Sequence, residues 1–150
     1  MKFSVLLYAA FLASALVLYR PAQATELNEL IPVEMLWVEA DEKGISVAGK
    51  EVQGVGDDWN AALRDLERTA SGTVFLETVE RIVVAEEAAE CLPELLKDGR
   101  LRPSVQFYFL RGSASEELEA FAKAHPSEAT AERPENPPVI IEEEGRYYLG

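Results

Sequence analysis

The only cysteine, Cys91, and the only histidine, His125, are the two side chains best suited to nucleophilic catalysis. Such catalysis requires a nucleophile held beside a base, so the two would have to meet in the fold. Cys91 stands among apolar residues, which favour a buried neutral thiol over a thiolate. His125 precedes Pro126 at the expected end of a helix, where it would interact with the carbonyl end of the helix dipole. The sequence therefore favours structural roles for both and predicts no catalytic residue.

A glycine pair, Gly54-Val55-Gly56, stands between an expected strand and an expected helix, as a dinucleotide-binding loop does. The third glycine of that fingerprint is missing, and Asp57-Asp58 places negative charge where a phosphate would bind. These residues favour a tight turn followed by a helix cap. We therefore expect no nucleotide and no other cofactor.

The acidic run Glu142-Glu143-Glu144 has the right ligand type for a cation. Successive residues of a strand point to alternate faces, however, so the three carboxylates would not converge. The spaced acidic loop of a calcium site is absent. The run is typical of a solvated hairpin tip, and we predict no metal site.

Residues 1–24 have the features of a signal peptide. Lys2 is followed by an apolar stretch, and Ala22-Gln23-Ala24 matches the small-x-small cleavage pattern. The expected cut lies between Ala24 and Thr25. The alternative is an uncleaved anchor, because the apolar stretch is close to the roughly 17 residues that a spanning helix needs. In both cases the remainder is exported.

Residues 25–150 are enough for one globular domain with a hydrophobic core. The formal charge of the whole chain is −13, and removal of Lys2 and Arg20 makes it about −15. Such a chain is repelled by nucleic acid and by anionic lipid head groups. A single cysteine cannot form a disulfide within the chain, so the fold depends on its core.

The stretch Val52–Glu87 predicts a helix followed by a buried strand. One helix face carries apolar residues at steps of three and four, from Trp59 to Ala70. Asp57 or Asp58 would cap its start, and Gly72 would end it with a left-handed backbone. The apolar run Val79–Ala85 is rich in β-branched residues, which is typical of a strand covered on both faces.

The remaining pattern completes an α/β arrangement. We expect a single-domain α/β sandwich with a mixed sheet of about five to six strands, packed by two to three helices. The last helix would be capped by Ser115, and both tryptophans fall in the apolar pattern of their elements. The expected strands are Pro32–Ala40, Ile45–Val52, Val79–Ala85, Pro103–Arg111, Val139–Ile141 and Arg146–Leu149, and the expected helices are Gly56–Ala70, Glu86–Asp98 and Ala114–His125.

Several segments of this pattern resemble a known family. Gly56–Asp58 and the helix after it, then Thr73–Leu76, Val79–Glu87 and Arg100–Gly112, resemble the N-terminal domain of the Ger(x)C spore-germination proteins. The resemblance implies an exported, non-enzymatic subunit of a germinant receptor at the spore membrane, with membrane-embedded receptor subunits as partners. Family members carry a lipidated cysteine just after the leader, where this sequence has Ala24-Thr25, so no lipid anchor is expected. They also continue into further domains.

Three functional classes remain open at this point. The first is an exported binding or interaction protein of the cell envelope, similar to the Ger(x)C domain. The second is a small extracytoplasmic hydrolase-like enzyme that uses Cys91 or a buried carboxylate. The third is a secreted acidic domain that binds cations.

Overall fold

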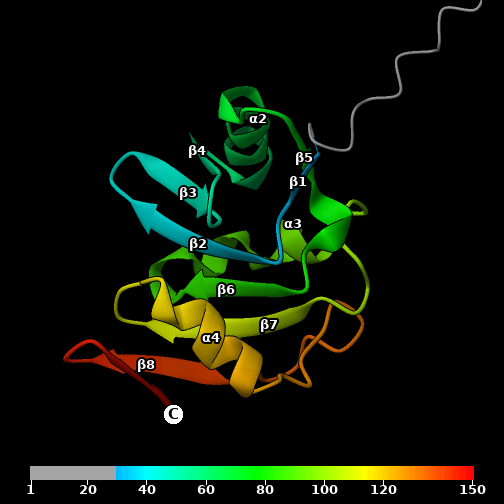
Figure 1. The fold of residues 1–150 in the computed structure, drawn as a ribbon. Helices are drawn as coiled ribbons and strands as arrows, with labels where there is room; N and C mark the ends of the chain where they lie inside the picture. Colours follow the sequence, from blue (N-terminus) through cyan, green and yellow to red (C-terminus); the bar gives the residue numbers. More distant parts are fainter. Residues whose placement is uncertain (1–29) are drawn as a thin grey trace, which may run out of the picture.

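The computed structural model describes residues 30–150, so the expected leader and its cleavage site at Ala24-Thr25 lie outside the described residues. The described part is α/β, with one seven-stranded mixed sheet and a small two-stranded sheet (Figure 1). No helix among residues 30–150 is long and apolar enough to cross a membrane. The strands are β1 (Leu30–Pro32), β2 (Met35–Asp41), β3 (Gly44–Ala48), β4 (Gln53–Gly56), β5 (Thr73–Phe75), β6 (Arg81–Ala85), β7 (Gln106–Arg111), β8 (Val139–Glu143) and β9 (Arg146–Leu149). The helices are α2 (Trp59–Thr69), α3 (Leu92–Leu96) and α4 (Glu117–Ala124), with short 3₁₀ turns η2 (Leu76–Thr78) and η3 (Glu86–Cys91).

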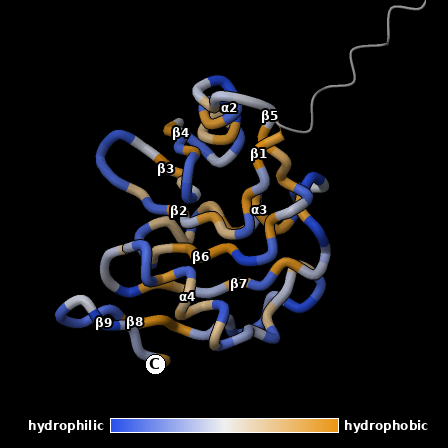
Figure 2. Tube along the Cα trace, viewed as in Figure 1, coloured by the Kyte–Doolittle hydropathy of each residue, from blue (hydrophilic) through white to orange (hydrophobic). Residues whose placement is uncertain are grey.

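The large sheet has a parallel centre and an antiparallel hairpin at each side. Its order is β4-β3-β2-β6-β7-β8-β9, and β2, β6, β7 and β8 run parallel. Ile82 of β6 lies between Leu36 and Phe107, and all three side chains are buried. Hydrophobic residues follow the central strands, whereas the turns of the two hairpins are hydrophilic (Figure 2). The expectation that the strand in Val79–Ala85 is covered on both faces is confirmed, because its residues enter both hydrophobic cores.

Two hydrophobic cores lie on opposite faces of the sheet, because successive strand residues alternate between faces. Ile82 and Phe107 belong to a core with α2, η3 and α3. Val83 and Tyr108 belong to a second core with α4. The Tyr108 hydroxyl donates toward carbonyl oxygens at the end of α4, 2.8 Å from that of His125. The fold is therefore an α/β sandwich with helices on both faces, as the sequence predicts in class.

The connections β6–α3–β7 and β7–α4–β8 have opposite hands. Both step in the same direction across the sheet, yet α3 and α4 pack on opposite faces. Parallel connections in proteins are right-handed in about 98% of cases. One of these two connections therefore departs from that rule. Among residues 30–150, α4 is the only helix on its face, and the β2–β3–β4 half of that face has no helix over it (Figure 1).

The glycine pair belongs to a strand, not to the turn that the sequence predicts. Gly54 and Gly56 face α2, and a Cβ on Gly54 would lie 2.2 Å from the carbonyl oxygen of Ala62. Strand β4 thus gives the sheet a seventh strand, one or two more than expected. The outer edge of β4 is closed by α2, because Asp65 accepts from the Val55 amide at 3.0 Å. That contact protects the edge from pairing with another chain.

Two expected helix caps are wrong, and one is confirmed. Asp58 caps α2 by accepting from the Ala61 amide at 2.7 Å. The helix ends at Ala70 with an extended backbone, and Gly72 does not have the positive φ of a left-handed cap. The Ser115 hydroxyl does not cap α4 because it accepts a hydrogen bond from Tyr147 at 2.9 Å.

Candidate binding groove

The structure separates Cys91 from His125. Cys91 is buried in η3 against the α2 face of the sheet. His125 ends α4 on the opposite face, where its Nδ1 lies 2.9 Å from the carbonyl oxygen of Phe121 and its ring stacks on that side chain. The expected roles of a buried thiol and a helix-end histidine are confirmed. The arrangement does not provide a nucleophile with a base beside it.

Burial raises the pKa of the Cys91 thiol to about 11, and the nearby Glu94 carboxylate adds to the shift. At pH 8 the native protein therefore has on the order of 10²-fold less thiolate than an unperturbed cysteine of pKa about 8.5. We expect thiol-exchange reagents to modify the native protein at least that much more slowly than the unfolded protein. Absorbance kinetics with and without denaturant check this, and equal rates would contradict the burial of Cys91.

The acidic run at the β8–β9 turn accepts hydrogen bonds from backbone amides. Glu142 accepts from the Gly145 amide at 2.8 Å and from the Ser113 amide at 3.4 Å. Glu144 and Gly145 have positive φ, as a tight two-residue hairpin turn requires. Within residues 30–150, no three His, Cys, Asp or Glu side chains are grouped as a metal ion would need.

The carboxyl ends of β6 and β7 are the place where many α/β sheets open a ligand crevice, because neighbouring connections leave there to opposite faces. An ion pair spans this place. Arg111 Nη2 lies 2.8 Å from Glu86 Oε1. The hydrogen bond from Arg111 lowers the pKa of Glu86 below its ordinary value. Both side chains are exposed, so the pair leaves a solvated surface rather than a formed cavity.

A groove lies on the half of the sheet that α4 leaves uncovered. We define it as two neighbouring cavities of about 540 and 270 Å³, which share Lys50 and Glu119 as lining residues. Trp37 and Met35 of β2 line its sheet side. One wall is the β3–β4 connection, residues 49–51, and the other is the start of α4, residues 114–119.

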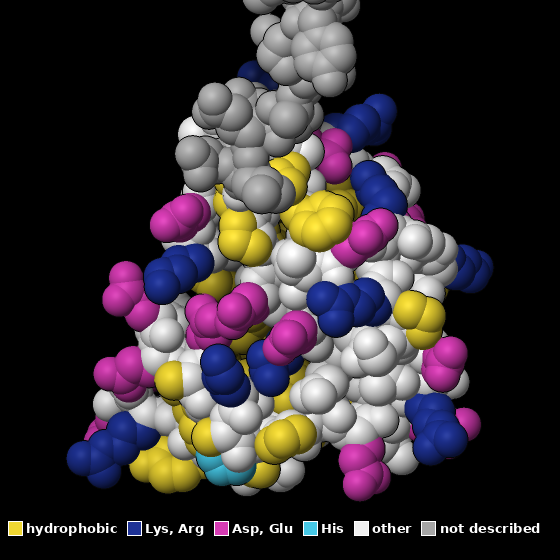
Figure 3. Space-filling model, turned by 45° about the vertical axis from the view of Figure 1, so that its right-hand side comes forward, with side chains coloured by type: hydrophobic (Ala, Val, Ile, Leu, Met, Phe, Trp, Pro, Cys, Tyr) yellow, Lys and Arg dark blue, Asp and Glu magenta, His cyan; other side chains and the backbone are white. Residues whose placement is uncertain are grey.

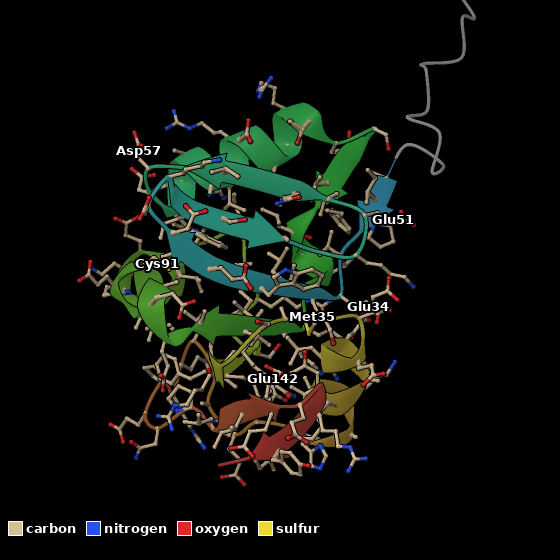
Figure 4. The ribbon with its side chains drawn as sticks, turned by 90° about the vertical axis from the view of Figure 1, so that its left-hand side faces the viewer. Glu34, Met35, Glu51, Asp57, Cys91 and Glu142 are labelled. Carbon is tan, nitrogen blue, oxygen red and sulfur yellow. The ribbon has the colours of Figure 1, made fainter. Side chains whose placement is uncertain are left out.

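The rim of the groove is acidic. It carries the carboxylates of Glu34, Glu51, Glu116 and Glu119, against the single ammonium of Lys50. Lys50 forms no ion pair with another described residue. Glu34 and Glu51 lie on the same side of the molecule, away from Cys91 (Figure 4). Figure 3 shows a turned view of the surface, on which acidic and basic side chains are interspersed.

Sequence reasoning did not find this groove, because it assigned Trp37 to the core. Trp37 is only partly buried, whereas Trp59 is fully buried. The available signal was the sequence Trp37-Val38-Glu39-Ala40-Asp41, in which Trp37 shares a strand face with two acids. An aromatic residue in line with exposed carboxylates is typical of a face that is partly open to solvent.

Comparison of the chain with protein-family models, with curated proteins and with solved structures finds no match in any of the three. We therefore infer the function of the protein from the groove and from the surface around it.

Proposed function

We propose that this chain is an exported, non-enzymatic interaction protein whose groove receives a protein partner. One observation carries the proposal: a partly exposed tryptophan lies in a two-walled groove, on the part of the sheet face that no helix among residues 30–150 covers. Tryptophan is enriched at the energetic centres of protein interfaces, where it anchors in a pocket bordered by polar residues. The acidic rim around Trp37 provides such a border.

The resemblance to the first Ger(x)C domain supplies the class of partner. In that proposal the partners are membrane-embedded subunits of a germination receptor, in the spore membrane or cell envelope. The hairpin β2–β3, the α2 helix and strands β6 and β7 occur in the order that the resemblance requires. The separation of Cys91 from His125 argues against the Cys91–His125 form of the hydrolase alternative.

Site-specific photo-crosslinking tests the proposal. The full chain, with its leader, carries a benzophenone amino acid in place of Lys50 in the groove, and irradiation is done on intact producing cells. We expect one discrete adduct that sediments with the membrane fraction. The matched position is Glu144, which is exposed at the tip of the β8–β9 turn and does not line the groove.

The proposal predicts an adduct from position 50 and no adduct from position 144. Adducts of equal intensity from both positions would indicate a non-specific surface and contradict the proposal. Complete absence of an adduct from position 50, with the protein exported and folded, would contradict it as well.

A further inference from the structure

We infer that the groove binds a cationic segment of its partner, with a lysine or arginine side chain over Trp37. This inference rests on the proposed function, because it names the chemistry of the occupant of the same groove. The ligand class is a polypeptide segment rich in Lys or Arg, in extended or loop conformation.

Charge complementarity is the first argument. Among the described residues that line the groove, four carry carboxylates and Lys50 is the only basic one. The whole chain carries a formal charge of −13, so the far field has the same sign as the rim. Such a field attracts a basic segment from a distance and repels an acidic one. Nucleic acid and anionic lipid are excluded as occupants by the same repulsion.

The second argument is the aromatic ring of Trp37, which lines the sheet side of the groove. The face of a tryptophan ring attracts a lysine or arginine cation more strongly than that of any other aromatic side chain. Trp37 lines the larger cavity together with Glu116 and Glu119, so a cation there would meet both a ring and carboxylates. The apolar side chains of the lining are Ile31, Pro32, Val33, Met35, Trp37 and Ala114, and they lie beside the rim carboxylates. An apolar surface bordered by carboxylates suits a long basic side chain, whose stem is apolar and whose head is charged.

Substitution of Lys50 should change the binding affinity in the opposite direction to substitution of a rim carboxylate. Lys50 lines both cavities and forms no ion pair with another described residue, so we expect its charge to compete with an incoming cation. Removing this charge should strengthen binding, whereas removing a rim carboxylate should weaken it. A surface that is merely acidic in a general way would not separate these effects by position.

Calorimetric titration of the exported protein with a short oligolysine peptide at low ionic strength tests the inference. We expect the double substitution Glu116→Gln with Glu119→Gln to weaken binding about fivefold, as two partly exposed ion pairs would. Lys50→Gln should tighten it about twofold. The matched control, Glu143→Gln with Glu144→Gln, removes the same charge from the β8–β9 turn, whose residues do not line the groove, and should change the affinity less than twofold.

An equal loss of affinity in the groove and hairpin-tip variants would overturn the inference, and so would the absence of binding by the unaltered protein. Tighter binding of an oligoglutamate peptide of the same length would overturn it too. The proposed function fails separately, because it predicts a groove-specific crosslink whatever the charge of the partner. A specific crosslink with no oligolysine affinity would leave the interaction role and remove only the cationic occupant.

Discussion

Replacing Gly54 with alanine is expected to destabilise the fold by about 3 kcal/mol or more, as overpacking against backbone does. The added methyl group would lie 2.2 Å from the Ala62 carbonyl oxygen and 2.3 Å from the Leu66 amide nitrogen. Both atoms belong to the backbone of α2, so no side chain can rotate away. The helix would have to move off β4, and the midpoint of thermal unfolding should fall by roughly 10 °C or more.

Val55→Ala is the matched control, because Val55 lies on the same strand with an exposed side chain. We expect it to change the free energy of unfolding by less than about 0.5 kcal/mol. Denaturant titrations of the two variants give the comparison. A Gly54→Ala protein as stable as the Val55→Ala protein would contradict the close packing of α2 on β4.

Replacing Asp98 with alanine is expected to cost about 2 kcal/mol, the range for hydrogen bonds to a charged group. Asp98 Oδ2 accepts from the Trp59 indole at 2.8 Å and from Arg100 at 2.7 Å, and its side chain is only 7% exposed. Without the carboxylate, the buried indole N–H loses its acceptor. Asp57→Ala is the control, because Asp57 is exposed next to the same helix start and should have an effect near zero.

The contribution of Asp98 should also depend on pH. Burial alone would raise the pKa of Asp98, but hydrogen bonds from Arg100 and Trp59 outweigh it and hold the pKa below its ordinary value. A lowered pKa stabilises the native state above the unfolded value near 4, and this stabilisation disappears as the pH falls through the native value. The difference in the free energy of unfolding between the unaltered protein and the Asp98→Asn variant should therefore shrink from pH 7 to pH 3. A constant difference over that range would contradict the ionised role of Asp98.

The elements that repeat a local pattern could be predicted from the sequence. The apolar stripe that includes Trp59, Leu63 and Leu66 gives α2, and all three side chains are fully buried. The β-branched run at Ile82–Val84 gives a central strand, because alternate residues enter both cores. Local chemistry also predicts a helix cap by Asp57 or Asp58, and Asp58 provides it.

Features that depend on distant partners could not be predicted. A glycine pair reads as a turn until α2 is known to lie against it, and only then does β4 become a strand. Ser115 matches a helix cap, but Tyr147, far along the chain, takes its hydroxyl. The usual handedness of parallel connections would place α4 on the same face as α3. Its position on the other face, beside the partly exposed Trp37, supplies one wall of the groove.

The two indole N–H signals in a heteronuclear NMR spectrum test the central claim, that the groove at Trp37 is the binding surface for a cationic partner. Trp59 is fully buried and donates to Asp98, so its signal serves as an internal control in the same spectrum. On addition of oligolysine, we predict that the Trp37 signal shifts progressively, together with the amides of residues 49–51 and 114–119, while the Trp59 signal stays in place. An unmoved Trp37 signal, or shifts that gather at the β8–β9 turn instead, would contradict the claim.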